Sequence, residues 1–154
     1  MVTVEIAKNF RRIDVSLPRL KKLVRAVCTH FGLSNMTVSI AVVGDSQFRK
    51  LNAYFLQSSR TSDCLSFDLS DNIPVEAPRL FEIVVNGEMA VTQAALRDHS
   101  AEAELALYIT HGLLHNLGFD DSTRKESRKM HKTEDEILQR FGYGPVYNGM
   151  SQKQ

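Results

Sequence analysis

The stretch from Leu105 to Leu117 constrains the fold of this chain more than any other, because it is apolar on nearly every side except at two histidines. Ser100 precedes it as a helix N-cap, and Gly118 follows it as a residue that can end a helix. A helix that is apolar all round has no face to offer to water, so it must lie buried among other elements. The rest of the chain is therefore expected to surround this helix.

The remaining pattern supplies a sheet and further helices for that purpose. Strand-like patterns occupy residues 2–6, 36–43, 64–67 and 81–86, and helical spacing occupies residues 17–31, 45–55, 88–98 and a last segment that begins at Ser122 or Thr123. This order predicts an α+β fold, a small mixed four-stranded sheet packed with about five helices, with the histidine helix at the centre.

Length and composition indicate one globular domain over residues 1–154, in which residues 142–154 form a tail that frays. No apolar run approaches the roughly 18 residues that a membrane span requires. The two cysteines, Cys28 and Cys64, lie in apolar runs, which favours buried thiols and a reducing compartment, here the cytoplasm.

The two histidines of the central helix, His111 and His115, are four residues apart and share one helix face. Burying two imidazoles costs several kcal/mol unless both find partners, and one metal ion satisfies both. Gly118 allows the chain to turn back, so that Asp121 can become a third ligand. The alternative is that Asp121 caps the next helix. Asp120 could orient a ligand or handle a proton.

Two histidines and one carboxylate leave a coordination position open for water. The set suits one Zn²⁺ per chain, and also Ni²⁺, Mn²⁺ or Fe²⁺. The spacing invites comparison with zinc proteases of the H-E-x-x-H type, whose glutamate is the general base. Gly112 stands at that position here, so peptide hydrolysis lacks its proton acceptor.

Four segments together resemble the YbeY family of bacterial proteins. Residues 111–121, HGLLHNLGFDD, are similar to the family signature H-G-x-L-H-L-x-G-Y-D-H. Residues 62–67 are similar to its T-D-V-L-S-F, residues 81–85 resemble its G-D-I-x-I strand, and Glu104 matches an acidic position seven residues before the first histidine. The similarity runs in the same order from about residue 2 to residue 142.

The resemblance implies a metal-dependent endoribonuclease that is specific for single strands and acts in ribosomal RNA maturation and ribosome quality control. It implies RNA, the small ribosomal subunit and ribosomal proteins as partners, with His111, His115 and position 121 as metal ligands. We expect a cytoplasmic monomer.

Two positions depart from the family pattern. The third ligand is usually histidine and is Asp121 here, which makes the site less positive. The family carries an arginine, implicated in handling RNA phosphate, just after an aromatic residue at the end of the second helix. The aromatic residue is Phe55, but the arginine's place holds Leu56. Arg60, four residues further on, is our candidate for this catalytic task, and the alternative is that it is an ordinary loop charge.

The charges are unevenly distributed along the chain. Residues 1–60 carry ten basic and three acidic side chains, whereas residues 61–120 carry two and ten. Basic residues on the first and last helices could guide an RNA backbone, and the alternative is that they form solvated helix surface. They are Arg19, Lys22, Arg25, Arg124, Lys125 and Arg128.

Two other functions compete with the nuclease. One is a metalloprotease-like hydrolase, which Gly112 weakens. The other is a non-catalytic ribosome-assembly factor in which the metal only ties the last helix to the core, and Leu56 favours it.

Overall fold

The computed structural model describes residues 1–56, 63–144 and 146. Its elements follow the order expected from the sequence, with one short 3-10 turn added between the third and fourth strands. The strands are β1 (Val2–Lys8), β2 (Met36–Val43), β3 (Cys64–Asp68) and β4 (Arg79–Asn86), and the 3-10 turn is η1 (Ser70–Asn72). The helices are α1 (Leu17–His30), α2 (Asp45–Leu56), α3 (Gly87–Arg97), α4 (Ala101–Asn116) and α5 (Arg124–Arg140).

The four strands form one mixed sheet in the order β1-β2-β4-β3. The strands β1, β2 and β4 are parallel, with Val38 level with Val4 on one side and with Phe81 on the other. The short strand β3 runs antiparallel to β4 and forms an edge. The burial pattern of β2 alternates, as the β-branched sequence predicts for a strand with two different faces.

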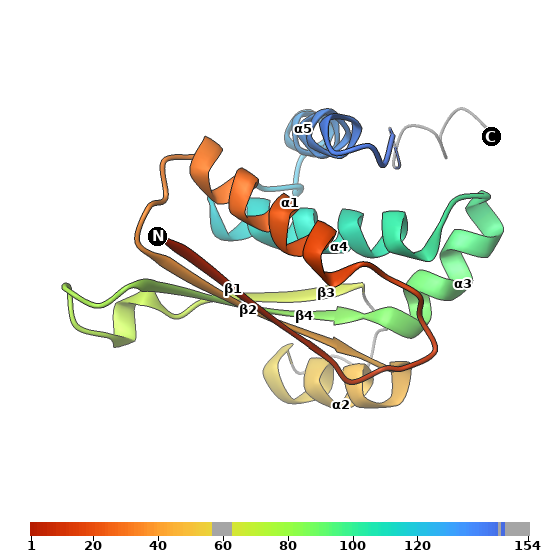
Figure 1. Ribbon diagram of the computed structural model, residues 1–154, viewed down its shortest axis with the longest axis horizontal. Helices are drawn as coiled ribbons and strands as arrows, with labels where there is room; N and C mark the ends of the chain where they lie inside the picture. The colour runs from red at the N-terminus through yellow and green to blue at the C-terminus, as the bar shows by residue number, and fades with distance from the viewer. Residues whose placement is uncertain (57–62, 145, 147–154) are drawn as a thin grey trace.

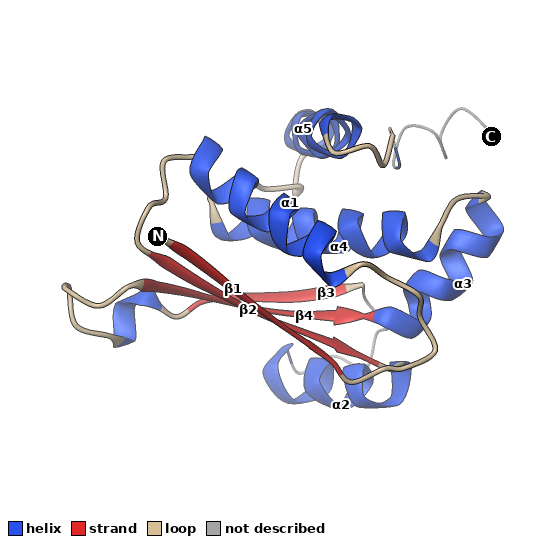
Figure 2. Cartoon of the chain, viewed as in Figure 1, coloured by secondary structure: helices blue, strands red, loops and turns tan. Residues whose placement is uncertain are grey.

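The helices form layers on both faces of this sheet. Helix α2 covers one face, α1 and α4 lie on the other, and α3 runs from the end of β4 toward the start of α4 (Figure 1). The elements in contact with α4 are α1, α3, β3, β4 and α5. In Figure 2 the helix lies between the red strands and α5. The α+β fold and the central position of the histidine helix are therefore confirmed.

Gly112 allows α4 to lie this close to the sheet. A Cβ atom at this position would come within 2.7 Å of the Cys64 Sγ and 3.3 Å of the Ile83 Cγ2. These atoms belong to β3 and β4, so with a larger residue either the helix or these side chains would have to move. The Cα–Cβ bond of a residue at position 112 would point toward β3 and β4, so any side chain there would point into the sheet.

The chain after α5 returns to the start of α4. The Tyr143 hydroxyl donates a 2.6 Å hydrogen bond to Glu102, and Val146 is buried in the main core. The other part of the tail that was expected to fray, residues 147–154, lies outside the described residues. Among the described helices, none is long and apolar enough to cross a membrane.

Candidate metal centre

Three side-chain atoms of the expected ligand set converge at the C-terminal end of α4. The Nε2 atoms of His111 and His115 lie 3.0 Å apart. The Oδ2 atom of Asp121 lies 3.8 Å from each of them. The turn of α4 between the two histidines and the loop after α4 thus bring together the residues that the spacing predicted. These three residues could hold a metal ion.

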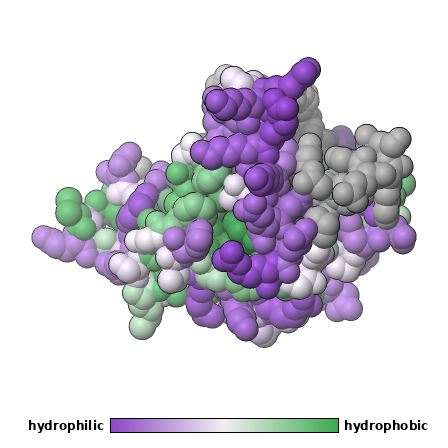
Figure 3. All heavy atoms as spheres, turned by 90° about the horizontal axis from the view of Figure 1, so that it is seen from above, coloured by the Kyte–Doolittle hydropathy of each residue, from purple (hydrophilic) through white to green (hydrophobic). Residues whose placement is uncertain are grey.

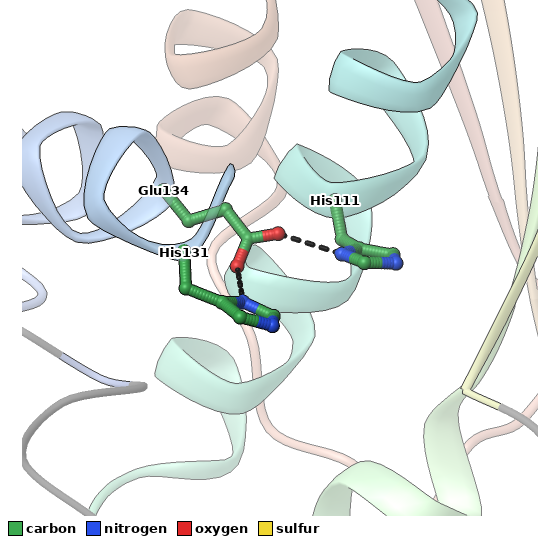
Figure 4. A group of neighbouring side chains, drawn as sticks. All are labelled: His111, His131 and Glu134. Atoms are coloured by element: carbon green, nitrogen blue, oxygen red, sulfur yellow. Dashed lines mark hydrogen bonds and ion pairs between the residues drawn. The ribbon is translucent and has the colours of Figure 1, made fainter. Parts of the chain in front are cut away.

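A buried carboxylate on α5 holds the first of these histidines in place. Glu134 is fully buried, and its Oε2 accepts a 2.6 Å hydrogen bond from the His111 Nδ1. Its Oε1 accepts a second bond of 2.6 Å from the His131 Nδ1. Figure 4 shows the carboxylate between the two rings, with both hydrogen bonds made by the Nδ1 atoms. Because a carboxylate here only accepts, each Nδ1 carries the proton, and the Nε2 of neutral His111 is available as a ligand.

Distances between atoms indicate which of the two groups that contain His111 suits a metal ion. Histidine nitrogen lies about 2.0–2.1 Å from zinc in a tetrahedral site, so two ligand atoms are about 3.3 Å apart. The separations of 3.0 and 3.8 Å among His111, His115 and Asp121 lie on either side of this value. The 2.6 Å contacts of Glu134 are hydrogen-bond lengths and too short for two ligands of one ion. Of the two groups that contain His111, the set with Asp121 therefore fits a metal better.

The charges of the site shift two pKa values in opposite directions. Burial alone would lower the pKa of His111, but the hydrogen bond with Glu134 and its negative charge outweigh burial and raise it. Burial alone would raise the pKa of Glu134, but the hydrogen bonds from His111 and His131 outweigh it and lower the pKa. The carboxylate is thus kept ionised although no water reaches it.

The loop after α4 positions Asp121 without making it a helix cap. Gly118 has φ of 101°, a left-handed conformation that turns the chain back. Thr123 caps α5 by accepting a hydrogen bond from the Glu126 N–H, so the alternative in which Asp121 caps α5 is not observed. The fully exposed Asp120 accepts hydrogen bonds from the N–H of Asp121 and the hydroxyl of Ser122, which lower its pKa.

Asn116 joins the end of α4 to the edge of the sheet. Its Nδ2 donates a 3.2 Å hydrogen bond to the backbone oxygen of Phe67 in β3. Together with the close contact at Gly112, this bond fixes the C-terminal part of α4, the last two turns that carry His111 and His115, against β3.

A polar cavity of about 300 Å³ opens beside His111. Asp63, Arg97, Tyr108 and His131 are among the side chains that line it. Burial raises the pKa of Asp63 in spite of the nearby His111. Space for a polar ligand therefore exists beside His111.

The basic residues expected to contact RNA lie on the surfaces of two helices. Lys22 and Arg25 are exposed on α1. Arg19 forms a 3.2 Å ion pair with Glu102 and lies over the Tyr143 ring. The partner of Arg19 is therefore distant from the candidate ligands, because Glu102 is nine residues before His111 on α4, or about 14 Å along the helix axis.

The other three basic residues, on α5, are all exposed, and Figure 3 shows a hydrophilic band along this helix. They are Arg124, Lys125 and Arg128. Arg60 lies outside the described residues.

Sequence reasoning missed Glu134 and His131. A signal for Glu134 was present, because Met130 and Leu138 stand four residues before and after it on the buried stripe of α5. A carboxylate in such a stripe needs a charged or hydrogen-bonding partner on the facing helix. His131 lies between stripe positions, and only the structure shows its contact with Glu134.

Comparison with known proteins identifies one family for this chain. The family model described as endoribonuclease YbeY matches residues 5–142. A protein from Anaeromyxobacter sp. named endoribonuclease YbeY is 31% identical over 141 residues, which cover 92% of this chain and 73% of the relative. A protein of the same name from Thermodesulfovibrio yellowstonii is 32% identical over 152 residues, covering 89% of this chain and 96% of the relative.

Among solved structures, the fold is similar to the solution structure of TM1509 from Thermotoga maritima. The TM-score is 0.60 at 20% sequence identity, and the match covers 96% of this chain and 95% of the other. At this identity the likeness supports the fold alone.

Proposed function

The chain belongs to the endoribonuclease YbeY family, and we propose that it is a metal-dependent hydrolase that cuts single-stranded RNA during the maturation and quality control of ribosomal RNA. One observation carries the proposal: the Nε2 atoms of His111 and His115 and a carboxylate oxygen of Asp121 converge, with His111 held by Glu134. Such a set binds a divalent transition ion, and we propose one Zn²⁺ per chain.

The ion, when bound there, would supply Lewis acidity toward a phosphate oxygen and acidify a water. The residues around the site have separate tasks. Glu134 keeps the His111 Nδ1 protonated, so that its Nε2 faces the other two ligands. Asp120 orients the loop that carries Asp121 through its hydrogen bond to the Asp121 N–H. Of the two roles that the sequence left open for Asp120, orientation has this contact in its favour.

RNA would approach over positively charged helix surface. We propose that Lys22 and Arg25 on α1 and Arg124, Lys125 and Arg128 on α5 attract the phosphate backbone, with a weaker part for Arg19, which already pairs with Glu102. Arg60 remains our candidate for steadying the charge that develops on phosphorus. We further propose a cytoplasmic monomer that works with the small ribosomal subunit and ribosomal proteins.

The protease alternative is opposed by the position of Gly112. A side chain there would point at Cys64 and Ile83 in the sheet, so a glutamate at this position could not serve as a base toward the ligand set. The assembly-factor alternative has the same metal centre and differs from the nuclease only in that it does not cleave RNA.

Cleavage of single-stranded RNA after zinc reconstitution tests the proposal. Wild type should bind one zinc and cut the strand. His115→Ala should lose both properties, Arg60→Ala should keep zinc and lose cleavage, and the exposed α1 histidine in His30→Ala should change neither. Equal cleavage by wild type and His115→Ala would contradict the metal mechanism. One bound zinc, co-sedimentation with the small subunit and no cleavage by wild type would favour the assembly factor.

A further inference from the structure

Two aromatic rings stand out on the surface of α2. Tyr54 is 78% exposed and Phe55 is 51% exposed, and no other tyrosine or phenylalanine in the described part of the chain is exposed to this extent. Their ring centroids are 4.9 Å apart, and Phe55 lies 5.0 Å from the partly buried Phe67 ring of β3. These three residues, Tyr54, Phe55 and Phe67, form a continuous aromatic strip.

The strip leads around the edge of the sheet toward the metal ligands. Phe67 belongs to the edge strand β3, and its side chain packs with the cluster under α2. Its backbone oxygen accepts the hydrogen bond of Asn116, the residue after His115. Figure 1 shows α2 on one face of the sheet and α4 on the other. An extended strand that leaves the metal centre across β3 would therefore meet Phe67 and then the exposed rings.

We propose that this strip is a stacking platform for the bases of single-stranded RNA that flank the cleaved bond, an inference that rests on the proposed function. Aromatic rings bind unpaired bases through their π faces without regard to sequence. Lys50, exposed four residues before Tyr54 on the same side of α2, supplies a positive charge for the backbone of the same strand. This surface of α2 therefore offers rings for the bases and a positive charge for a phosphate.

The size of the strip favours nucleobases over a docked protein. A stable protein interface buries about 800 Å² on each partner, which two exposed rings cannot supply. A single exposed ring is enough for one base, because a base stacks on the face of the ring and does not need a large interface around it. A protein partner is therefore an outcome of the test and not the proposal.

The experiment compares two strands of equal length and charge, one intact and one abasic throughout. Fluorescence anisotropy gives the affinity of each for wild type and for the Tyr54→Ala/Phe55→Ala variant, with strand integrity checked on a gel. Wild type should prefer the intact strand, and loss of both rings should weaken intact-strand binding by at least about thirtyfold. Binding of the abasic strand and its salt dependence should stay the same, because no phosphate contact is removed.

Controls separate stacking from general apolar contact and from misfolding. Phe55→Trp should keep the preference, whereas Phe55→Leu, which is apolar but has no ring, should lose part of it. Leu96→Ala removes a side chain that is 75% exposed on α3 and should leave both affinities unchanged. Far-ultraviolet circular dichroism and thermal melts identify any variant that has not folded.

The outcomes distinguish this inference from the proposed function. If wild type shows no preference for the intact strand, or if the ring variant keeps that preference, the stacking platform is refuted even when wild type cleaves RNA. If the preference depends on the rings but wild type does not cleave, the rings do stack on RNA bases, whereas the nuclease function and the position of the rings beside a cleaved bond are both refuted. Unchanged preference together with lost binding to the small ribosomal subunit would make the strip a protein contact and overturn the proposal.

Discussion

Replacing Gly112 with alanine tests how closely the metal-site helix must approach the sheet. The added methyl group would lie 2.7 Å from the Cys64 Sγ, 3.3 Å from the Ile83 Cγ2 and 3.4 Å from the Ser66 Cβ. The first distance is far below ordinary van der Waals contact, and the contacted atoms belong to β3 and β4, the strands on which α4 packs. Either α4 or these side chains must move.

Two opposing contributions set the expected size of the effect. An extra methylene in a tightly packed site costs about 1–3 kcal/mol. Alanine recovers about 1 kcal/mol of helix propensity relative to glycine. Since three neighbours are crowded at once, we expect a net loss of about 1–2 kcal/mol, which corresponds to a drop in Tm of roughly 3–7 °C for a chain of this size.

Cys64 provides the matched background for this measurement. In a Cys64→Ala protein the nearest obstacle is gone, so Gly112→Ala should cost less there, and the two changes should couple by about 1 kcal/mol. Urea unfolding of the metal-free proteins, followed by circular dichroism, gives the four free energies of a double-mutant cycle. An alanine variant as stable as wild type, or the same cost in both backgrounds, would refute the close-packing argument.

Further predictions concern the site and the tail. Glu134→Gln should weaken zinc binding by about tenfold to a hundredfold in a chelator competition, because His111 loses its anionic partner; unchanged affinity would show that this contact does not tune the ligand. The metal-free protein should also lose stability in both pH directions. Because its pKa is lowered in the fold, Glu134 contributes stability above its ordinary pKa of 4.5, and this contribution is lost as acid protonates the carboxylate. Because its pKa is raised in the fold, His111 contributes stability below its ordinary pKa of 6.5, and this contribution is lost as base removes the proton. Unfolding of Glu134→Gln across this range should show a flatter profile. Asp121→His should keep one zinc per chain and Asp121→Ala should not, as measured by metal analysis after gel filtration; equal content in the two would remove Asp121 from the ligand set. Tyr143→Phe should lower the free energy of unfolding by about 1.5–3 kcal/mol through loss of a hydrogen bond to the Glu102 carboxylate, and a change within error would mean that water replaces it.

The elements were predictable where one signal was strong and local. The β-branched run gave β2 its full extent from Met36 to Val43, and Ser16 and Ser100 act as the helix caps that the sequence indicated. These features depend on side chains within one turn or one strand of each other. The order of the strands and the antiparallel direction of β3 depend on contacts between distant segments, and no local pattern specifies them.

The candidate site divides in the same way. His111, His115 and Asp121 lie within eleven residues, so helix geometry and one left-handed glycine were enough to bring them together. Glu134 acts from a different helix, and its partner is decided by how α5 packs on α4. A buried carboxylate signals that a partner exists but does not identify it.

The hydrogen bond between Glu134 and His111 spans 23 residues of sequence, which has a consequence for the growing chain. Synthesis proceeds from the N-terminus, so α4 and the loop with all three ligands are made before the residue that orients the first histidine. Until α5 is complete and has docked, the His111 ring is free to rotate and its tautomer is not fixed. In the nascent protein the orientation and tautomer of His111 are therefore not yet fixed, and they become fixed only when α5 packs on α4.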